Sequence, residues 1–449
     1  MCTFIITNDK KIDNQLDLLS ALGGPSASNT VIINGITVKH NLLSITGKLT
    51  VQPIQVDQKY FMLMGEIYNY DKKHPSDIYT AIDMYLQYGN SFTEYLDGEF
   101  LIVIFDKEND TIDFYTDPWA TRQAYFYQKN DIFYFSTLPL REPKIIRHRT
   151  VPYFILDDIQ LKKSFIDHDL EWIQHYEQLP HNSHCRYDIK QKKLSTINNN
   201  LHIWNLDQPT DNLKNVTEAF EQAVLKRYVN NSVLYLSGGI DSSAIAACLS
   251  DHKKSFNSIT LRLTEIEDKV SFDSIINYTK EYNNNHIIDK SLSPSNDLQS
   301  LREVLIRRRF LTKLATPQMI IREKTKKIFG SNVVLVGNGS DEIIDNYMSK
   351  QLSEFSEWPE TLSTIFPWTH FYNGFCRRLI PFHETISLAY GLELRNIYYD
   401  KHLVQTWINT TPRLKNKESK HFLRQYLSNR QITISNAKAG FHQQYHEEV

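Results

Sequence analysis

The segment with the clearest chemical potential is Val-Leu-Tyr-Leu-Ser-Gly-Gly-Ile-Asp-Ser-Ser at residues 233–243. Its first four residues are apolar and predict a buried strand. The serine and two glycines predict a tight turn, and the residues after them open an apolar, Ala-rich helix. Such a turn gathers backbone N–H groups at the positive end of a helix dipole, and its glycines let an anion approach closely. The segment therefore predicts a phosphate-binding loop.

Seven residues of this loop are predicted to bind a nucleotide: Leu236, Ser237, Gly238, Gly239, Asp241, Ser242 and Ser243. The serines add hydroxyl donors, and Asp241 can hold Mg²⁺ against the phosphates. No Gly-Lys-Ser/Thr follows, so the loop is not of the Walker type. It resembles the Ser-Gly-Gly-x-Asp-Ser loop of ATP pyrophosphatases, which implies cleavage of ATP between its α and β phosphates. An ordinary glycine turn before a buried helix is the structural alternative.

A second loop of the same kind follows about a hundred residues later. The apolar run Val333–Val336 predicts a strand, and Gly337, Asn338, Gly339, Ser340 and Asp341 come directly after it. In a parallel sheet, ligands bind beyond the carboxyl ends of the strands. We therefore expect Gly337 and Gly339 to contact the nucleotide, and Asp241 and Asp341 to converge on one Mg²⁺. A helix N-cap is the alternative role for Asp341.

The elements around these loops predict two domains, residues 1–200 and 210–449. The first 140 or so residues predict several short strands separated by turn signals; one of these strands is Thr30–Val38. They also predict one amphipathic helix at Ser76–Gly89, and the combination is typical of an α+β domain. After residue 212, strands alternate with helices, including one at 299–309. That alternation predicts a parallel, doubly wound sheet.

Composition narrows the class of protein. The 449 residues carry a formal net charge of −2, which gives no basic surface and argues against nucleic-acid binding. The four cysteines form no CxxC pair, so we expect reduced thiols and a cytoplasmic location. We find no signal peptide and no apolar run of membrane-spanning length. Expected partners are small-molecule or peptide substrates, and the sequence leaves open whether the chain forms a homodimer.

Several motifs in order resemble the class B asparagine synthetase family over nearly the whole chain. In the C-terminal half, besides the two glycine loops, the motifs are Thr316-Pro317, Gly391-Leu392-Glu393-Leu394-Arg395 with Asp400, Lys420-His421-x-Leu423-Arg424 and Lys438-x-x-Phe441. Near the N-terminus they are Gly65-Glu66-Ile67-Tyr68-Asn69, Leu96-Asp97-Gly98-x-Phe100 and Asp117-Pro118 with Arg122.

The resemblance implies a fold and a reaction for each domain. The N-terminal domain would be an Ntn-hydrolase-like glutaminase sandwich, with Cys2 as nucleophile after removal of Met1. The C-terminal domain would be an α/β synthetase of the ATP-pyrophosphatase type, which adenylates a carboxylate and couples it to ammonia or an amine. The resemblance also places Lys438 near the α-phosphate, where a fixed positive charge stabilises the charge that develops in the transition state.

The glutaminase motifs depart from the family at two positions. Met64 stands where the family has the oxyanion-hole Asn, and loss of one such donor costs about 10²–10³ in rate. Leu42 stands where the family has the Arg that grips the glutamine carboxylate. We therefore expect an inactive glutaminase in which Cys2 is a leftover small hydrophobe, although Gly65, Glu66 and Asp97 remain.

The synthetase motifs depart at Asn338, where asparagine synthetases have Glu and related β-lactam synthetases have Tyr. An amide cannot act as a general base. Glu384, shortly before the Gly391 motif, is the candidate base, and a solvated carboxylate on a helix face is the alternative. Lys420 and Arg424, one helical turn apart, are expected to face water or phosphate.

The sequence thus favours an AMP-forming amide ligase that uses ATP and Mg²⁺. The damaged glutamine site favours an amine other than glutamine-derived ammonia, as in β-lactam synthetases and lasso-peptide cyclases of natural-product biosynthesis. Asparagine synthesis from glutamine or ammonia is one alternative, and a non-catalytic scaffold is another. Sulfur transfer, as in thiolating pyrophosphatases, is disfavoured because no CxxC pair follows the loop.

Overall fold

The structure is a computed structural model that describes residues 2–12, 14–138, 177–261, 269–289, 315–348 and 353–434. The chain divides into two compact units. The first contains Met1–Ile203 together with Arg377–Glu393, and the second contains the segments that begin at Trp204 and at Leu394. Lys438 and the helix predicted at 299–309 lie outside the described residues.

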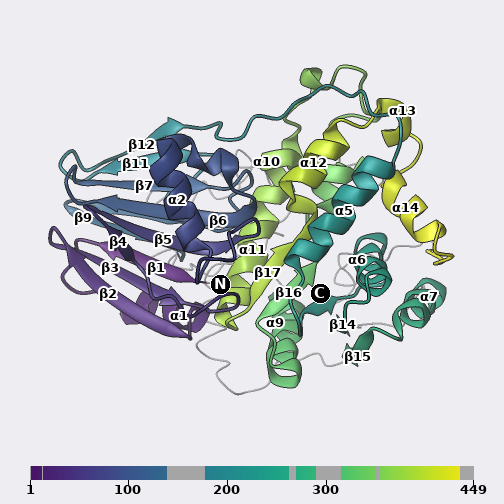
Figure 1. Ribbon diagram of the computed structural model, residues 1–449, viewed down its shortest axis with the longest axis horizontal. Helices are drawn as coiled ribbons and strands as arrows, with labels where there is room; N and C mark the ends of the chain where they lie inside the picture. Colours follow the sequence, from purple (N-terminus) through teal and green to yellow (C-terminus); the bar gives the residue numbers. More distant parts are fainter. Residues whose placement is uncertain are drawn as a thin grey trace, which may run out of the picture. The chain divides into compact units, whose positions relative to one another are not determined.

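The first unit is built on two antiparallel sheets, each with six strands among the described residues (Figure 1). One sheet has the order β10 (Glu177–Gln178), β8 (Tyr125–Lys129), β9 (Ile132–Ser136), β1 (Thr3–Thr7), β3 (Ile36–Leu42) and β2 (Ala27–Ile33). The other has the order β12 (Lys193–Asn198), β11 (His184–Asp188), β7 (Thr111–Thr116), β6 (Gly98–Asp106), β5 (Lys59–Ile67) and β4 (Ile54–Val56).

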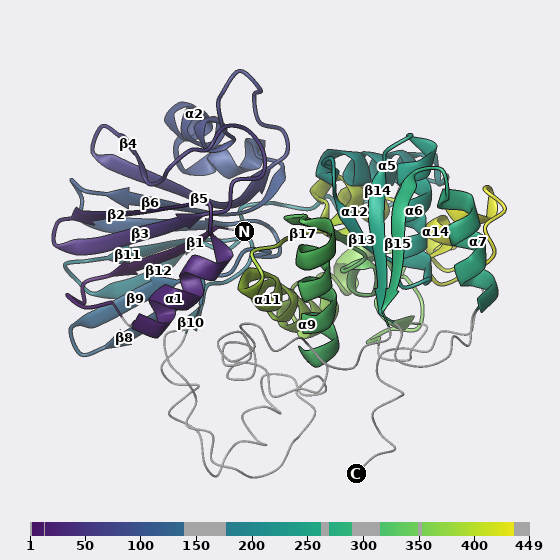
Figure 2. The same cartoon turned by 90° about the horizontal axis from the view of Figure 1, so that it is seen from below.

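The two sheets pack face to face around an apolar core. Phe4 of β1 and Phe135 of β9 meet Phe114 of β7 in one buried cluster, with rings 6.5 Å and 4.5 Å apart. Helix α2 (Ile78–Tyr88) and the 3-10 helix η1 (Gly89–Tyr95) pack on the second sheet from outside. Helix α1 (Asn14–Gly23) lies at β1, where the Thr3 hydroxyl donates to the Ser20 carbonyl (Figure 2). The predicted Ntn-type sandwich is confirmed.

Some predicted elements differ in detail. The single strand predicted at Thr30–Val38 is wrong, because Asn34 and Gly35 turn the chain between β2 and β3. Their φ angles of 48° and 79° are those of a tight hairpin turn, which Asn-Gly favours. The predicted helix at Ser76–Gly89 corresponds to α2, whereas α1 was not predicted.

The second unit contains a sheet with the order β15 (Asn283–Asp289), β14 (Phe256–Leu261), β13 (Val233–Tyr235), β16 (Val333–Val336) and β17 (Glu393–Asn396), five strands among the residues described. The pairs β13–β14, β14–β15 and β13–β16 are parallel. The predicted α/β fold of this domain is confirmed.

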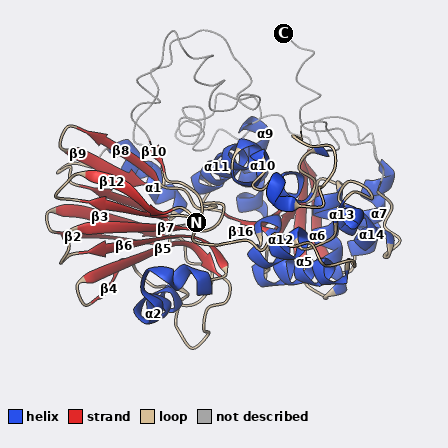
Figure 3. Ribbon diagram, turned by 90° about the horizontal axis from the view of Figure 1, so that it is seen from above, coloured by secondary structure: helices blue, strands red, loops and turns tan. Residues whose placement is uncertain are grey.

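Helices account for much of the second unit, whereas strands dominate the first (Figure 3). The described α-helices of the second unit are α5 (Lys214–Arg227), α6 (Ile240–Asp251), α7 (Lys269–Thr279), α9 (Ala315–Lys324), α10 (Thr369–Tyr372), α12 (Lys401–Ile408), α13 (Pro412–Lys415) and α14 (His421–Ser428). Four shorter helical segments accompany them: η2 (Thr325–Phe329), η3 (Ser340–Ile344), η5 (Leu362–Thr364) and η6 (Ile397–Tyr399). Helix α11 (Gly374–Ala389) lies mostly in the first unit.

The strand order places the two glycine loops side by side. From β13 the chain moves outward through β14 to β15, and then returns to β16 on the other side of β13. A crevice forms where the order reverses in this way, at the carboxyl ends of the strands. The loops that follow β13 and β16 therefore border the same crevice. No helix among the described residues is long and apolar enough to span a bilayer.

Candidate functional site

The loop after β13 is held by its own hydroxyl groups. The Ser237 amide donates to the Ser242 hydroxyl at 3.1 Å, the two serine hydroxyls lie 3.0 Å apart, and the Gly239 amide donates to the Ser237 hydroxyl at 3.3 Å. Gly238 has a φ of +79°, which favours glycine, and a Cβ there would lie 3.0 Å from the Phe272 ring. Leu236 and Ser243 are buried, so neither side chain extends the loop surface.

Helix α6 begins at this loop without a side-chain cap. Its N-cap is Gly239, and no side-chain cap bond is present there. The first amides of an uncapped helix need acceptors and carry partial positive charge, which suits a phosphate group. The loop and helix start therefore fit the triphosphate of ATP, which the sequence predicted.

The loop after β16 contacts the first loop directly. The Ser340 hydroxyl donates to Asp241 Oδ1 at 2.7 Å, and a Cβ on Gly337 would lie only 3.0 Å from Asp241 Cβ. Gly339 has a φ of +97°, and a Cβ there would lie 3.1 Å from the Tyr399 ring and 3.2 Å from the Tyr398 Cβ. The structure thus brings together the two loops that the sequence placed a hundred residues apart.

Lys420 joins the two loops through a single ammonium group. Its Nζ donates to both carboxylate oxygens of Asp241 at 2.8 Å and to Asp341 Oδ1 at 2.6 Å. Burial lowers the pKa of Lys420, but the charges of Asp241 and Asp341 outweigh that effect and raise it above its usual value. Lys420 is 4% exposed, so the expectation that it faces water is wrong, because its ammonium group is buried against the two aspartates. That it faces phosphate stays a prediction.

The positions of Asp241 and Asp341 around Lys420 Nζ show whether the two carboxylates could bind one Mg²⁺. Both aspartates reach one nitrogen atom within hydrogen-bonding distance, so both could reach one cation. Two carboxylates that share one ammonium keep an excess negative charge, and their side chains remain 15% and 21% exposed. Carboxylate oxygens with phosphate oxygens are the ligands that Mg²⁺ usually takes. The donors therefore fit the predicted ion, with Lys420 beside it.

A second acidic group fixes the shape of the loop after β16. Glu342 Oε2 accepts from the Gly339 amide at 3.1 Å, and the Tyr347 hydroxyl donates to Glu342 Oε1. Burial and then the neighbouring Asp341 charge raise the pKa of Glu342 to about 7. Glu342 therefore holds the loop that carries Asp341 rather than facing a ligand.

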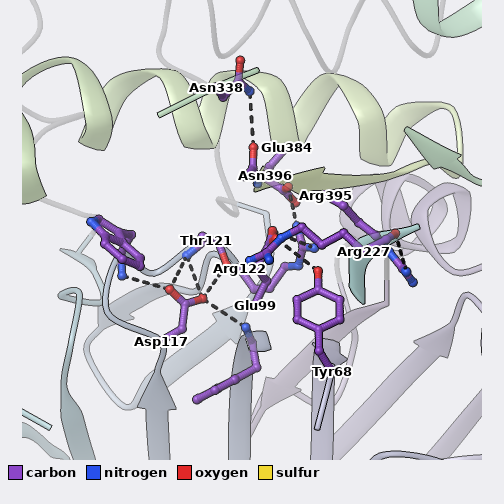
Figure 4. Close-up of polar contacts among 12 residues, drawn as sticks. Tyr68, Glu99, Asp117, Thr121, Arg122, Arg227, Asn338, Glu384, Arg395 and Asn396 are labelled. Carbon is purple, nitrogen blue, oxygen red and sulfur yellow. Dashed lines mark hydrogen bonds and ion pairs between the residues drawn. The ribbon is translucent and has the colours of Figure 1, made fainter. Parts of the chain in front are cut away.

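Asn338 pairs with another amide at the end of the neighbouring strand. Its Nδ2 donates to Asn396 Oδ1 at 3.4 Å, and Asn396 is the last residue of β17 (Figure 4). Asn396 is buried with 2% of its surface exposed, whereas Asn338 is half-buried. The position predicted to lie beside the reacting groups therefore carries a neutral amide pair.

Glu384, the predicted base, belongs to a buried charge cluster of the first unit. It lies on α11 and accepts from Arg122, which also lies 3.5 Å from Glu99 (Figure 4). Glu384 is 3% exposed, so the alternative of a solvated carboxylate is wrong. One guanidinium serves two carboxylates here, and burial raises the pKa of Glu384 to about 7. Its role as a base stays a prediction.

Cys2 lies in a hollow of the first unit that apolar and polar side chains line together. Cys2, Leu42, Gly65 and Glu66 line one hollow in the first unit. The thiol is 6% exposed, and burial raises its pKa to about 11. Leu42 and Met64 pack with Cys2 in the apolar core.

Three further contacts escaped sequence reasoning: those of Ser340, Tyr398 and Lys420. The Tyr398 hydroxyl donates to the Asp241 carbonyl at 2.9 Å, so the segment after β17 also supports the first loop. Ser340 and Lys420 both lie within motifs noted in the sequence, and those motifs were the available signal.

Two segments of the chain match known protein families. Residues 215–371 match the asparagine synthase family, and residues 1–168 match the glutamine amidotransferase domain family. A probable glutamine-hydrolyzing asparagine synthetase of Dictyostelium discoideum is 24% identical, with 87% of this chain and 71% of that protein covered. Asparagine synthetase 1 of Saccharomyces cerevisiae is also 24% identical, over 87% and 72% of the two chains.

Solved structures add little to this assignment. Glutamine phosphoribosylpyrophosphate amidotransferase from B. subtilis aligns over 75% of this chain and 81% of its own, with 9% identity and a TM-score of 0.29. A similarity of that size carries no argument about fold or function.

Proposed function

We propose that the chain is an ATP-dependent carbon–nitrogen ligase that forms an amide and releases AMP and pyrophosphate; its matches to the asparagine synthase and glutamine amidotransferase families support this proposal. The observation that carries the proposal is the meeting of two glycine loops at the buried Lys420. Phosphate-binding amides, two carboxylates and a fixed cation together suit a nucleoside triphosphate.

The chain's own residues would act as follows. The Ser237–Ser242 loop and the start of α6 hold the β and γ phosphates, so that pyrophosphate leaves into amide donors. The substrate carboxylate attacks the α-phosphate, and the amine then attacks the mixed anhydride. Asp241 and Asp341 would hold Mg²⁺, which supplies charge neutralisation at the phosphates when bound.

Two cations would act beside those groups. Lys420 keeps the two aspartates oriented toward one point and offsets part of their charge. Lys438, outside the described residues, is proposed to stabilise charge at the α-phosphate. Holding carboxylate, nucleotide and amine together supplies much of the rate by proximity.

We further propose that the amine does not come from glutamine. A thiol with a pKa of about 11 is almost wholly protonated at neutral pH, and only the thiolate is a strong nucleophile. The apolar Leu42 cannot grip a carboxylate. This favours an amide-forming cyclase or ligase of natural-product biosynthesis over glutamine-dependent asparagine synthesis. The second candidate, asparagine synthesis, is supported by the names of the relatives.

ATP–pyrophosphate exchange tests the ligase proposal. The purified chain is incubated with Mg-ATP, labelled pyrophosphate and a panel of carboxylates that includes L-aspartate and peptide acids. We expect exchange with at least one acid, and AMP rather than ADP as product. Asp241→Asn should abolish exchange, whereas the matched control Asp273→Asn on the exposed face of α7 should not. Formation of ADP, or no exchange with any acid, would refute the proposal.

A measurement of the amine source completes the test. Each active acid is offered ammonia, glutamine and a set of amines. Glutamate release coupled to amide formation would favour asparagine synthesis. Amide formation with amines but without glutamate release would favour the glutamine-independent ligase.

A further inference from the structure

Tyr398 reaches both glycine loops with one side chain. It lies in the short helix η6, directly after β17, and is wholly buried. Its hydroxyl donates to the main-chain carbonyl of Asp241 at 2.9 Å. At the other end of the side chain, the Tyr398 Cβ lies only 3.2 Å from the place that a Cβ on Gly339 would take. The ring therefore spans the distance between the loop after β16 and the start of α6.

The surroundings of Tyr398 leave its ring little freedom to move. Phe220 of α5 stacks on it, with ring centroids 5.8 Å apart and planes inclined by 20°. The backbone is fixed just beyond the ring, because the Asp400 amide donates to the Ile397 carbonyl and the Asp400 carboxylate binds Arg227 of α5. A side chain packed in this way acts as a rigid spacer between the two loops.

The bond from Tyr398 differs in kind from the other contacts of Asp241. Lys420 and Ser340 both donate to the carboxylate, at 2.8 Å and 2.7 Å. A cation that binds this carboxylate must share or replace those contacts. The Tyr398 hydroxyl binds the main-chain carbonyl instead, whose second lone pair can still serve the helix amide four residues later. This bond need not break when the carboxylate changes its partner.

The Tyr398 hydroxyl also remains a donor. Burial, and then the charge of Asp241, raise the pKa of Tyr398 well above its usual value. The phenol therefore keeps its proton throughout the neutral pH range. A phenylalanine at this position would retain the ring and its packing and would lose the hydrogen bond alone.

The spacing of two carboxylates decides which cation suits them. Mg²⁺ requires near-ideal octahedral geometry with oxygen atoms at about 2.0–2.1 Å, whereas Ca²⁺ accepts flexible geometry at about 2.3–2.6 Å. Carboxylates held at a fixed spacing can meet the strict requirement of the smaller ion, and they resist the widening that the larger ion needs. Carboxylates on loosely held loops accept either ion.

We propose that Tyr398 is a positioning residue that fixes the spacing of the two glycine loops and thereby makes the Asp241–Asp341 pair selective for Mg²⁺ over Ca²⁺. This role rests on the proposed function, because it takes the two aspartates as the carboxylates that hold the metal of an ATP-dependent ligase. Tyr398 acts through the main chain of Asp241 and through Gly339 rather than on the reacting groups.

Metal binding to the whole 449-residue chain, without nucleotide, tests this role. Mn²⁺ is the probe, since the electron paramagnetic resonance signal of the free ion falls when it binds, and Mg²⁺ and Ca²⁺ are added as competitors. The ratio of the Ca²⁺ and Mg²⁺ concentrations that displace half of the bound Mn²⁺ measures selectivity. We expect a ratio greater than one in the wild type. In Tyr398→Phe it should be about 3–10-fold lower, which corresponds to the loss of one neutral hydrogen bond.

Tyr426→Phe is the matched control. Tyr426 lies on α14, packs edge-on against the same Phe220 ring and donates its hydroxyl to Glu221 at 3.0 Å. This variant removes a buried phenol hydroxyl from the same unit and leaves the bond to Asp241 in place, so it should keep the wild-type ratio. Melting temperatures in EDTA show that both variants fold, and we expect the two values to be similar.

Pyrophosphate exchange provides a second readout. Tyr398→Phe should raise the Mg²⁺ concentration that gives half the maximal rate by about 3–10-fold, with little change in the rate at saturating Mg²⁺. A wild-type ratio in Tyr398→Phe, an equal fall of the ratio in Tyr426→Phe, or no binding of Mn²⁺ by the wild type would overturn the inference. Absence of exchange with every acid would overturn the ligase function, whereas the competition between metals would still decide the role of Tyr398.

Discussion

Replacement of Lys420 by methionine should make the synthetase unit depend on magnesium for stability. The substitution keeps the apolar stem and removes the charge that joins Asp241 to Asp341. Breaking a buried ion pair costs about 3–5 kcal/mol, because a charge is left uncompensated. Both aspartates remain partly exposed, at 15% and 21%, so water recovers part of that energy. We expect a loss of about 2–3 kcal/mol.

Thermal unfolding with and without metal measures this effect. For a domain of about 150–250 residues, a loss of 1 kcal/mol in unfolding free energy lowers the melting temperature by about 2–4 °C. The melting temperature of Lys420→Met in EDTA should therefore lie about 5–10 °C below that of the wild type. Magnesium can replace the missing ammonium, and a ligand at 100 times its Kd contributes about 2.7 kcal/mol. Saturating magnesium should therefore restore most of the loss in Lys420→Met and stabilise the wild type much less.

The matched control is Lys280→Met, which removes an exposed lysine. It should melt like the wild type under both conditions. A Lys420→Met variant that melts at the wild-type temperature in EDTA would refute the reasoning. So would one whose stability magnesium raises no more than it raises that of the wild type.

Three further predictions concern buried ionisable groups. Asp400 binds Arg227 and caps α12; burial alone would raise its pKa, but the nearby positive charges lower it to about 2. The stabilisation of the fold by Asp400 is therefore complete at neutral pH and is lost as pH falls from about 4 to 2. In denaturant unfolding at pH 7, Asp400→Asn should lower the free energy of unfolding by about 3–5 kcal/mol. Burial raises the pKa of Glu384 to about 7, so the stability of the first unit should fall as pH rises from about 4.5 to 7. Glu384→Gln should remove about 2–4 kcal/mol of that dependence in melts recorded across this pH range, and an unchanged dependence would contradict the prediction. Cys2, with a pKa of about 11, should react with iodoacetamide far more slowly at pH 7 than at pH 10 in labelling followed by mass spectrometry, and rapid labelling at pH 7 would contradict its burial.

Local sequence signals predicted the geometry of the two glycine loops well. The apolar run, the glycines and the helix start after residue 233 are consecutive, so their geometry is set by neighbours along the chain. Alternation of strands and helices then predicted the parallel sheet, and the strand-end rule placed the loop after β16 beside the loop after β13. These features depend on short-range propensity and on general rules of topology.

Contacts between distant residues could not be predicted in the same way. Lys420 lies 179 residues from Asp241, and Arg122 lies 262 residues from Glu384. From sequence alone, a lysine near the start of a helix and a glutamate within a helix are both expected to be exposed to solvent. Only the packed chain shows that each is buried against a partner of opposite charge.

The packing of Leu42 and Met64 restricts which side chains the first unit can accept at these two positions. Both side chains now belong to the core that includes Cys2, and Met64 is wholly buried. An arginine at 42 would have to place a guanidinium in that core, and an asparagine at 64 would bury an amide, at about 1–3 kcal/mol if unpaired. Each step back would weaken folding before it restored any chemistry.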